Sequence, residues 1–208
     1  MVKVNRNADG VDPGVGVAPG AGSRIRNLVW GALFVALGIV LPIAFHAIGA
    51  GPVFLPMHIP VLLAGFFVGP AMGAAVGFLT PILSAVLTGM PPLMPPVAQM
   101  MMVELAVYGF LTGFLYGRLR QNAIISLVGA MFAGRVVYGV LGAYLLPLFG
   151  LKAIPVFYPI TLGVVKSLPG ILIQLVLIPA VIYLAEGSTR AGVLFSRNRD
   201  GACKGAGQ

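Results

Sequence analysis

Three ionisable side chains stand inside long apolar stretches of this 208-residue sequence: Glu104, Arg135 and Lys166. A charge at mid-bilayer is costly unless it is paired or hydrated, so such residues are functional by default. Counted at about 1.5 Å per helical residue, Glu104 lies about 12 Å, and Arg135 and Lys166 about 10 Å, below the outer boundary of the hydrocarbon. Two cations and one acid at one depth predict a pocket for a small anionic ligand, such as a carboxylate.

Hydrogen-bonding side chains accompany these charges. Tyr138 lies one turn from the arginine and Tyr108 one turn from the glutamate, on the same helix faces. Gln99 and Gln174 are interpreted as residues that either form hydrogen bonds between helices or contact the ligand. His58 is expected to be an interfacial hydrogen-bonding residue and not a metal ligand, because no second His, Cys or carboxylate stands at ligand spacing. We therefore expect no metal and no cofactor.

A structural alternative explains the same three charges. Glu104 and Arg135 form an ion pair that only stabilises the fold, and Lys166 extends its ammonium group to the membrane interface. Pairing and ligand binding do not exclude each other.

The composition sets the class of protein. Hydrophobic residues make up 59% of the chain and charged residues 9%, with a mean hydropathy of +1.01. A soluble domain carries about a quarter charged residues, so this chain is predicted to be an all-α, polytopic membrane protein. The net charge of +8 falls mostly beside the apolar segments, which indicates topology and no nucleic-acid partner. Cys203 is the only cysteine, so no disulfide framework is expected.

Six helices must position the site residues. The apolar runs predict transmembrane helices over about 27–45, 57–68, 71–87, 97–116, 123–148 and 159–184. The second is short for a span and is expected to borrow residues from the preceding loop. A kink is expected at Pro169 in the last. Glycines at four-residue spacing, Gly69, Gly73 and Gly77 and again Gly109, Gly113 and Gly117, predict close helix packing, and Gly69-Pro70 predicts a tight turn.

The flanks of the helices predict the topology. We expect a disordered cytoplasmic leader over residues 1–23, a six-helix transmembrane domain over 24–186 and a basic cytoplasmic tail over 187–208. Ten lysines and arginines fall on the side of the termini against one, Lys152, in the opposite loops. This bias places both termini in the cytoplasm and the protein in the cell membrane.

Over about residues 24–186 the sequence resembles a known family, the substrate-binding S components of energy-coupling factor (ECF) vitamin importers. Ala32 and Ala36, within the stretch 31–38, are similar to the family's small-xxx-small motif. The run 59–65, followed by Gly69-Pro70 and a glycine-rich helix, is similar to the family's second and third helices.

The resemblance implies a fold and a mechanism. A six-helix bundle captures a vitamin from outside, and the Ala32/Ala36 surface contacts a transmembrane coupling subunit that two ATPase subunits drive. Internal helix packing is the alternative role for these two alanines. The absence of a GxxxxGK[ST] loop agrees with ATP hydrolysis by a partner. The intramembrane cations favour a carboxylate-bearing substrate, and pantothenate is expected ahead of niacin, folate or a hydroxymethylpyrimidine.

Two other classes of protein agree less well with the sequence. An intramembrane enzyme needs a nucleophile with a base, or paired acids, and the sequence contains no GxSxG, no HExxH and no second acid near Glu104. An ion-coupled carrier predicts inverted repeats with broken helices, and two matching halves are not evident. The expected function is therefore substrate binding without catalysis.

Overall fold

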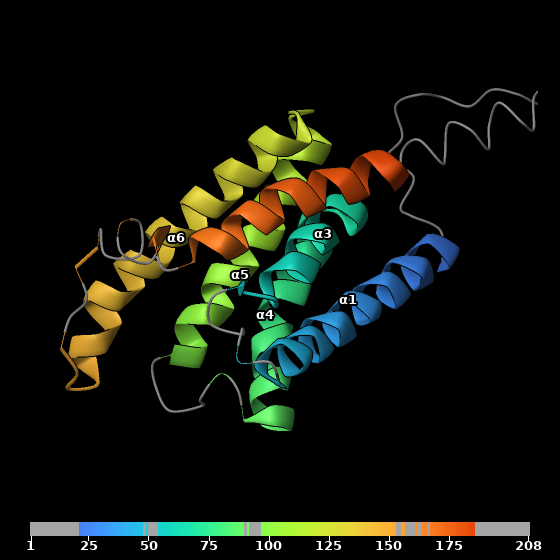
Figure 1. The fold of residues 1–208 in the computed structure, drawn as a ribbon. Coiled ribbons are helices and arrows are strands. Elements are labelled where there is room, and N and C mark those ends of the chain that lie inside the picture. The colour runs from blue at the N-terminus through green and yellow to red at the C-terminus, as the bar shows by residue number, and fades with distance from the viewer. Residues whose placement is uncertain are drawn as a thin grey trace, which may run out of the picture.

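The computed structural model describes residues 21–47, 49, 54–89, 91, 97–152, 155–156, 161, 164–165 and 167–185. Within these residues the chain folds into helices and contains no strand (Figure 1). The helices are α1 Ala21–Ala47, α3 His58–Val68, α4 Pro70–Thr88, α5 Val97–Gly113 with a π-helical extension η1 Phe114–Arg118, α6 Ala123–Leu148, and a last helix Leu168–Ala185.

The described helices are long and apolar enough for a membrane protein. Five of them could cross a bilayer, Arg24–Ala47, Pro70–Thr88, Ala98–Arg118, Ala123–Leu148 and Leu168–Ala185, and α3 is a shorter apolar helix. Their outward faces are apolar, as at Val29, Val128 and Val176, which are 63%, 48% and 72% exposed. Such a surface suits lipid and not water. The prediction of an all-α membrane bundle is confirmed.

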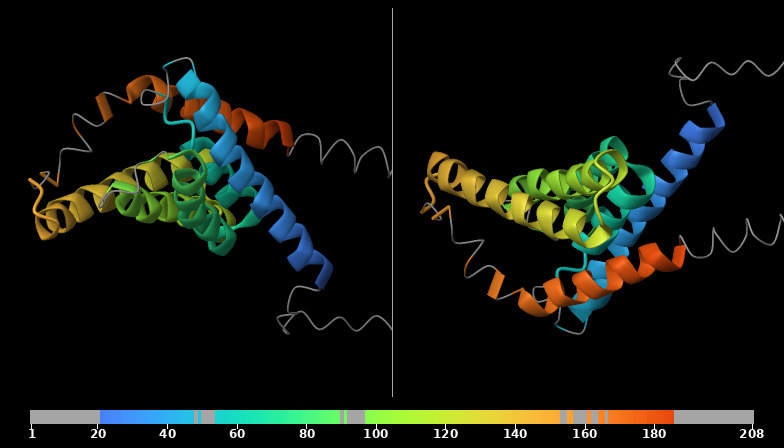
Figure 2. Two further views of the ribbon diagram at one scale, coloured as in Figure 1. Left: turned by 90° about the horizontal axis from the view of Figure 1, so that it is seen from below. Right: turned by 90° about the horizontal axis from the view of Figure 1, so that it is seen from above.

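Helix α5 contacts α3, α4 and α6, and α1 contacts α3 and α4. In the two views of Figure 2, α1 crosses the group of α3, α4 and α5 obliquely, whereas α5 and α6 run side by side. Gly31 of α1 faces the side chains of Met72 and Val76 on α4, and Gly38 faces Thr80. The lack of a side chain at both glycines brings α1 close to α4.

Glycines set the distance between α4 and α5. A Cβ at Gly73 would overlap the backbone of Gly109, and a Cβ at Gly109 would overlap the backbone of Gly73. Gly77 faces the backbone of Leu105 one turn further along, and Gly113 faces the turn before α4. The predicted packing is therefore confirmed at these four glycines.

The outer members of the two glycine series do not pack against a neighbouring helix. A Cβ would meet nothing within 4 Å at either Gly69 or Gly117. Gly69 instead makes the predicted turn between α3 and α4, with φ 94° and an N–H that donates to the carbonyl oxygen of Gly65 at 3.1 Å. This φ is in the region that favours glycine, and Pro70 then begins α4, where its missing N–H costs nothing.

Two predictions about helix limits were wrong. Helix α3 begins at His58 and does not borrow from the preceding loop, because Leu55 has a φ of 48°, which no helix continues. The last long helix begins at Leu168 after a turn at Ser167, so it is not continuous from residue 159, and Pro169 lies in its first turn; Val164 and Val165, before that turn, are also helical. Helix α1 is longer than expected and includes residues 21–26. Of the predicted leader, residues 1–20 lie outside the described residues, as does the predicted tail from 187 on.

Candidate functional site

The centre of the site is a carboxylate on α5. Glu104 is 2% exposed although it lies in an apolar helix. One turn along, the Tyr108 hydroxyl donates a hydrogen bond of 2.8 Å to Glu104 Oε1. Tyr108 is itself 1% exposed. This short bond to a charged acceptor holds the carboxylate in one orientation.

Arg135 of α6 reaches this carboxylate from the neighbouring helix. Its Nη1 lies 3.5 Å from Glu104 Oε1, and its Nη2 donates to the hydroxyl of Ser167 at 3.4 Å. The preceding residue, Gly134, allows this approach because a Cβ there would overlap the Tyr108 ring. The network thus joins α5, α6 and the residue that precedes the last helix.

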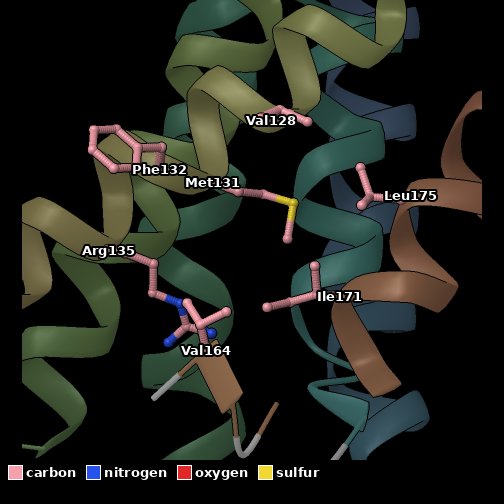
Figure 3. A pocket seen from close by; sticks show the side chains of 7 residues that line it. All are labelled: Val128, Met131, Phe132, Arg135, Val164, Ile171 and Leu175. Atoms are coloured by element: carbon pink, nitrogen blue, oxygen red, sulfur yellow. The ribbon is translucent and has the colours of Figure 1, made fainter. Parts of the chain in front are cut away.

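A cavity of about 180 Å³ opens beside the arginine (Figure 3). It lies between α6 and the chain around the last helix, and its lining residues are Val128, Met131, Phe132, Arg135, Val164, Ile171 and Leu175. Figure 3 shows the Arg135 guanidinium beside Val164 at one end of the cavity, with Met131 extending toward Ile171 and Leu175. Among the described residues Arg135 is the only ionisable group in this lining, and Glu104 lies outside the lining.

His58 is buried, whereas the sequence predicted a residue at the membrane interface. It is 3% exposed, and the centre of its ring lies 5.3 Å from the ring of Tyr108. Neither ring nitrogen has a hydrogen-bond partner in the described part of the chain. His58 is therefore a core residue beside the network and not an interfacial one, because the turn at Leu55 and the start of α3 bring it inside the bundle. No group of three or more His, Cys, Asp or Glu side chains that could hold a metal ion occurs among the described residues.

The remaining predicted residues divide into three cases. Tyr138 is half-buried on α6, one turn from Arg135. Gln99 is half-buried, and its Oε1 has no hydrogen-bond partner within the described residues. Lys166 lies outside the described residues.

Two polar residues, one just before the last helix and one within it, matter more to the site than the sequence pattern indicated. Ser167 contacts Arg135, and Gln174 is 0% exposed with neither amide atom paired inside the described part. Within the described residues Gln174 makes no side-chain hydrogen bond to another helix, which was one of its two interpretations. Ser167 and Gln174 are seven residues apart, which is about two helical turns, so the signal was two polar residues on one face of an apolar segment.

The geometry leaves the guanidinium available to a ligand. Both of its contacts are longer than the 2.7–3.2 Å or so that is usual for N–H···O bonds, whereas the bond from Tyr108 to Glu104 is short. Arginine has five N–H donors in a fork that matches a carboxylate. The arrangement can therefore bind a carboxylate in the cavity while Glu104 remains in place.

A bundle of apolar helices around an internal polar network defines a multi-pass membrane protein with a site for a small ligand. The family model "ECF transporter, substrate-specific component" matches residues 26–182. The chain belongs to this family, as its resemblance implied, and members of the family are transport subunits that bind small molecules and associate with components of the ECF module. No curated protein and no solved structure matches the chain significantly.

Proposed function

We propose that this chain captures a small, carboxylate-bearing vitamin such as pantothenate from outside the cell and releases it inward. The observation that carries the proposal is the position of Arg135, the one ionisable group among the described residues that line an otherwise apolar cavity. A cavity of about 180 Å³ suits a small molecule, and a single well-placed charge in an apolar pocket fixes the orientation of its ligand.

Charge balance favours an anionic substrate. Glu104 neutralises Arg135 only through a long contact of 3.5 Å, and it accepts the Tyr108 hydrogen bond on the same oxygen. A ligand carboxylate can take up the free donors of the guanidinium as a bidentate pair, which is the stronger arrangement. His58 and Gln174 are further buried groups with unused hydrogen-bonding capacity, which a polar ligand can satisfy.

The partners follow from α1 and from membership of the family. Ala32 and Ala36 are both exposed on α1, while Phe34 and Gly38 between and beyond them face the bundle. Small residues on an exposed helix face allow another helix to approach closely. The proposed partner on this face is the transmembrane coupling subunit, with two ATPase subunits that hydrolyse the ATP. Both termini are proposed to be cytoplasmic, in line with the distribution of basic residues.

Mass spectrometry of small molecules released from the purified protein in detergent tests the proposal directly. Pantothenate, niacin and folate carry a carboxylate and agree with the charge argument, whereas a neutral ligand such as a hydroxymethylpyrimidine contradicts it. Calorimetric titration with the released compound then compares Arg135→Ala with a control, Arg26→Ala, at an exposed position of α1.

The arginine variant has a defined expected effect. Truncating one partner of a buried charge pair costs about 2–5 kcal/mol, so the affinity should fall at least about 30-fold. The control should bind as the unaltered protein does. Equal affinities of the two variants would contradict the proposed site.

A further inference from the structure

A second, wholly apolar groove lies between α4 and α5, away from the cavity beside Arg135. Its volume is about 470 Å³, and its lining includes Ala74 and Phe78 of α4 and Val103, Ala106 and Phe110 of α5. The helices touch through their glycines just behind it. Phe78 and Phe110 are each 44% exposed, and they stand beside the smaller side chains of the two alanines. The groove therefore arises from close backbone packing with large side chains at its sides.

Beyond the groove, two arginines stand at the end of α5 and in the turn that follows it. The rings of Phe110 and Phe114 are stacked, with centroids 5.8 Å apart and an interplanar angle of 11°. Arg118 follows one turn later at the end of the π-helix, about 12 Å along the axis from Phe110 at 1.5 Å per residue. Arg120 is held nearby with a φ of 51°.

These two arginines have no acidic partner in the described structure. Both are exposed, and Glu104 is the only acidic residue among those described, where it pairs with Arg135. A non-glycine residue at positive φ is uncommon, so the turn presents Arg120 at some conformational cost. Two cations without an acidic partner among the described residues thus lie beyond the Phe110 end of the groove, at the predicted cytoplasmic surface.

We propose that this groove binds an anionic phospholipid, with one acyl chain along Ala106 and Phe110 and the headgroup phosphate at Arg118 and Arg120. The described lining offers no polar group that would recognise a protein backbone. A flexible hydrocarbon chain can follow it. Basic side chains at the membrane surface attract anionic headgroups. This lipid site is independent of the vitamin site.

Native mass spectrometry of the full-length protein in detergent tests the site. The protein is titrated with dioleoylphosphatidylglycerol or, as the zwitterionic probe, dioleoylphosphatidylcholine. We expect one phosphatidylglycerol to be retained preferentially. Arg118→Gln should weaken its retention about five-fold, the contribution of one basic side chain near an anionic lipid, whereas Arg26→Gln should leave it unchanged.

The apolar half of the site has its own variants. Ala106→Phe fills the groove and should lower retention of both lipids, whereas Ala180→Phe at an exposed position of the last helix should not. Phe78→Ala removes one side of the groove from an exposed position, so it remains informative if Ala106→Phe does not fold. Equal retention of the two lipids, or retention unaffected by Arg118→Gln, would overturn the proposal. So would loss of the coupling subunit, without loss of lipid, in Ala106→Phe.

Discussion

Replacing Glu104 by Gln removes the only negative charge in the described bundle while preserving the shape of the side chain. The amide oxygen can still accept the hydrogen bond from Tyr108, which is 2.8 Å long with the carboxylate. What changes is the environment of Arg135, whose Nη1 lies 3.5 Å from the carboxylate. The substitution therefore tests the ion pair without opening a cavity.

The structure sets the size of the effect. The side chains of Glu104 and Arg135 are 3% and 15% exposed, so removal of one partner leaves a largely buried charge. Breaking a buried pair usually costs 3–5 kcal/mol or so. The contact is long and the guanidinium reaches the cavity, so we expect a loss of about 2–3 kcal/mol, near the lower end of that range. For a chain of this size that is about 5–10 °C in melting temperature.

The matched control is the double variant Glu104→Gln with Arg135→Met. It removes the orphaned cation, and replacement of a buried pair by apolar groups is often close to neutral. Its stability should return to within about 1 kcal/mol of the unaltered protein. Thermal unfolding in one detergent, followed by circular dichroism, measures both variants.

Ligand binding separates the structural role of the pair from its proposed functional one. Glu104→Gln removes a carboxylate that competes for the guanidinium, so it should bind an anionic ligand more tightly despite its lower stability. Two results would refute the reasoning: an unchanged melting temperature in the single variant, or a double variant no more stable than the single one.

Two further substitutions test the packing and the partner surface. Gly109→Ala places a Cβ into the backbone of α4 and should lower the free energy of unfolding by at least about 2 kcal/mol. The Cβ of its control, Gly117→Ala, meets nothing within 4 Å, so this variant should be neutral or more stable by up to about 1 kcal/mol. Equal melting temperatures of the two variants would contradict the packing. Ala36→Trp should abolish co-purification with the coupling subunit and leave vitamin binding intact. Val176→Trp, at an exposed position of the last helix, should leave both intact. Retention of the complex by Ala36→Trp would argue against this interface.

The depth of a residue along its helix could be predicted from the sequence. The direction in which its side chain points around the helix axis could be predicted only in part. Counting residues from the ends of the segments placed Glu104 and Arg135 at one level, and the structure brings them into contact. The four-residue spacing of Gly73, Gly77, Gly109 and Gly113 identified the faces that pack. Both arguments use only the fixed rise and period of an α-helix.

The remaining features depend on non-local geometry. The burial of His58 follows from the turn at Leu55, whose positive φ no sequence rule for leucine predicts. The start of the last helix at Leu168 is not evident from the sequence because apolar residues stand on both sides of Lys166 and Ser167. The role of Ser167 depends on how far α6 lies from that helix, and the rise and period of a single helix do not contain this distance.

The position of the ion pair depends on two residues that are adjacent to glycines in the sequence, Tyr108 before Gly109 and Arg135 after Gly134. Tyr108 and Gly109 are adjacent on α5, so this turn meets α6 through an aromatic ring and α4 through bare backbone. On α6, Gly134 accepts that ring, and Arg135 is the next residue. Because the ring rests against a residue without a side chain, α6 comes close enough for the adjacent guanidinium to reach the carboxylate one turn from Tyr108. The same packing that replaces the hydrophobic effect inside a bilayer thus also positions the polar groups of the site.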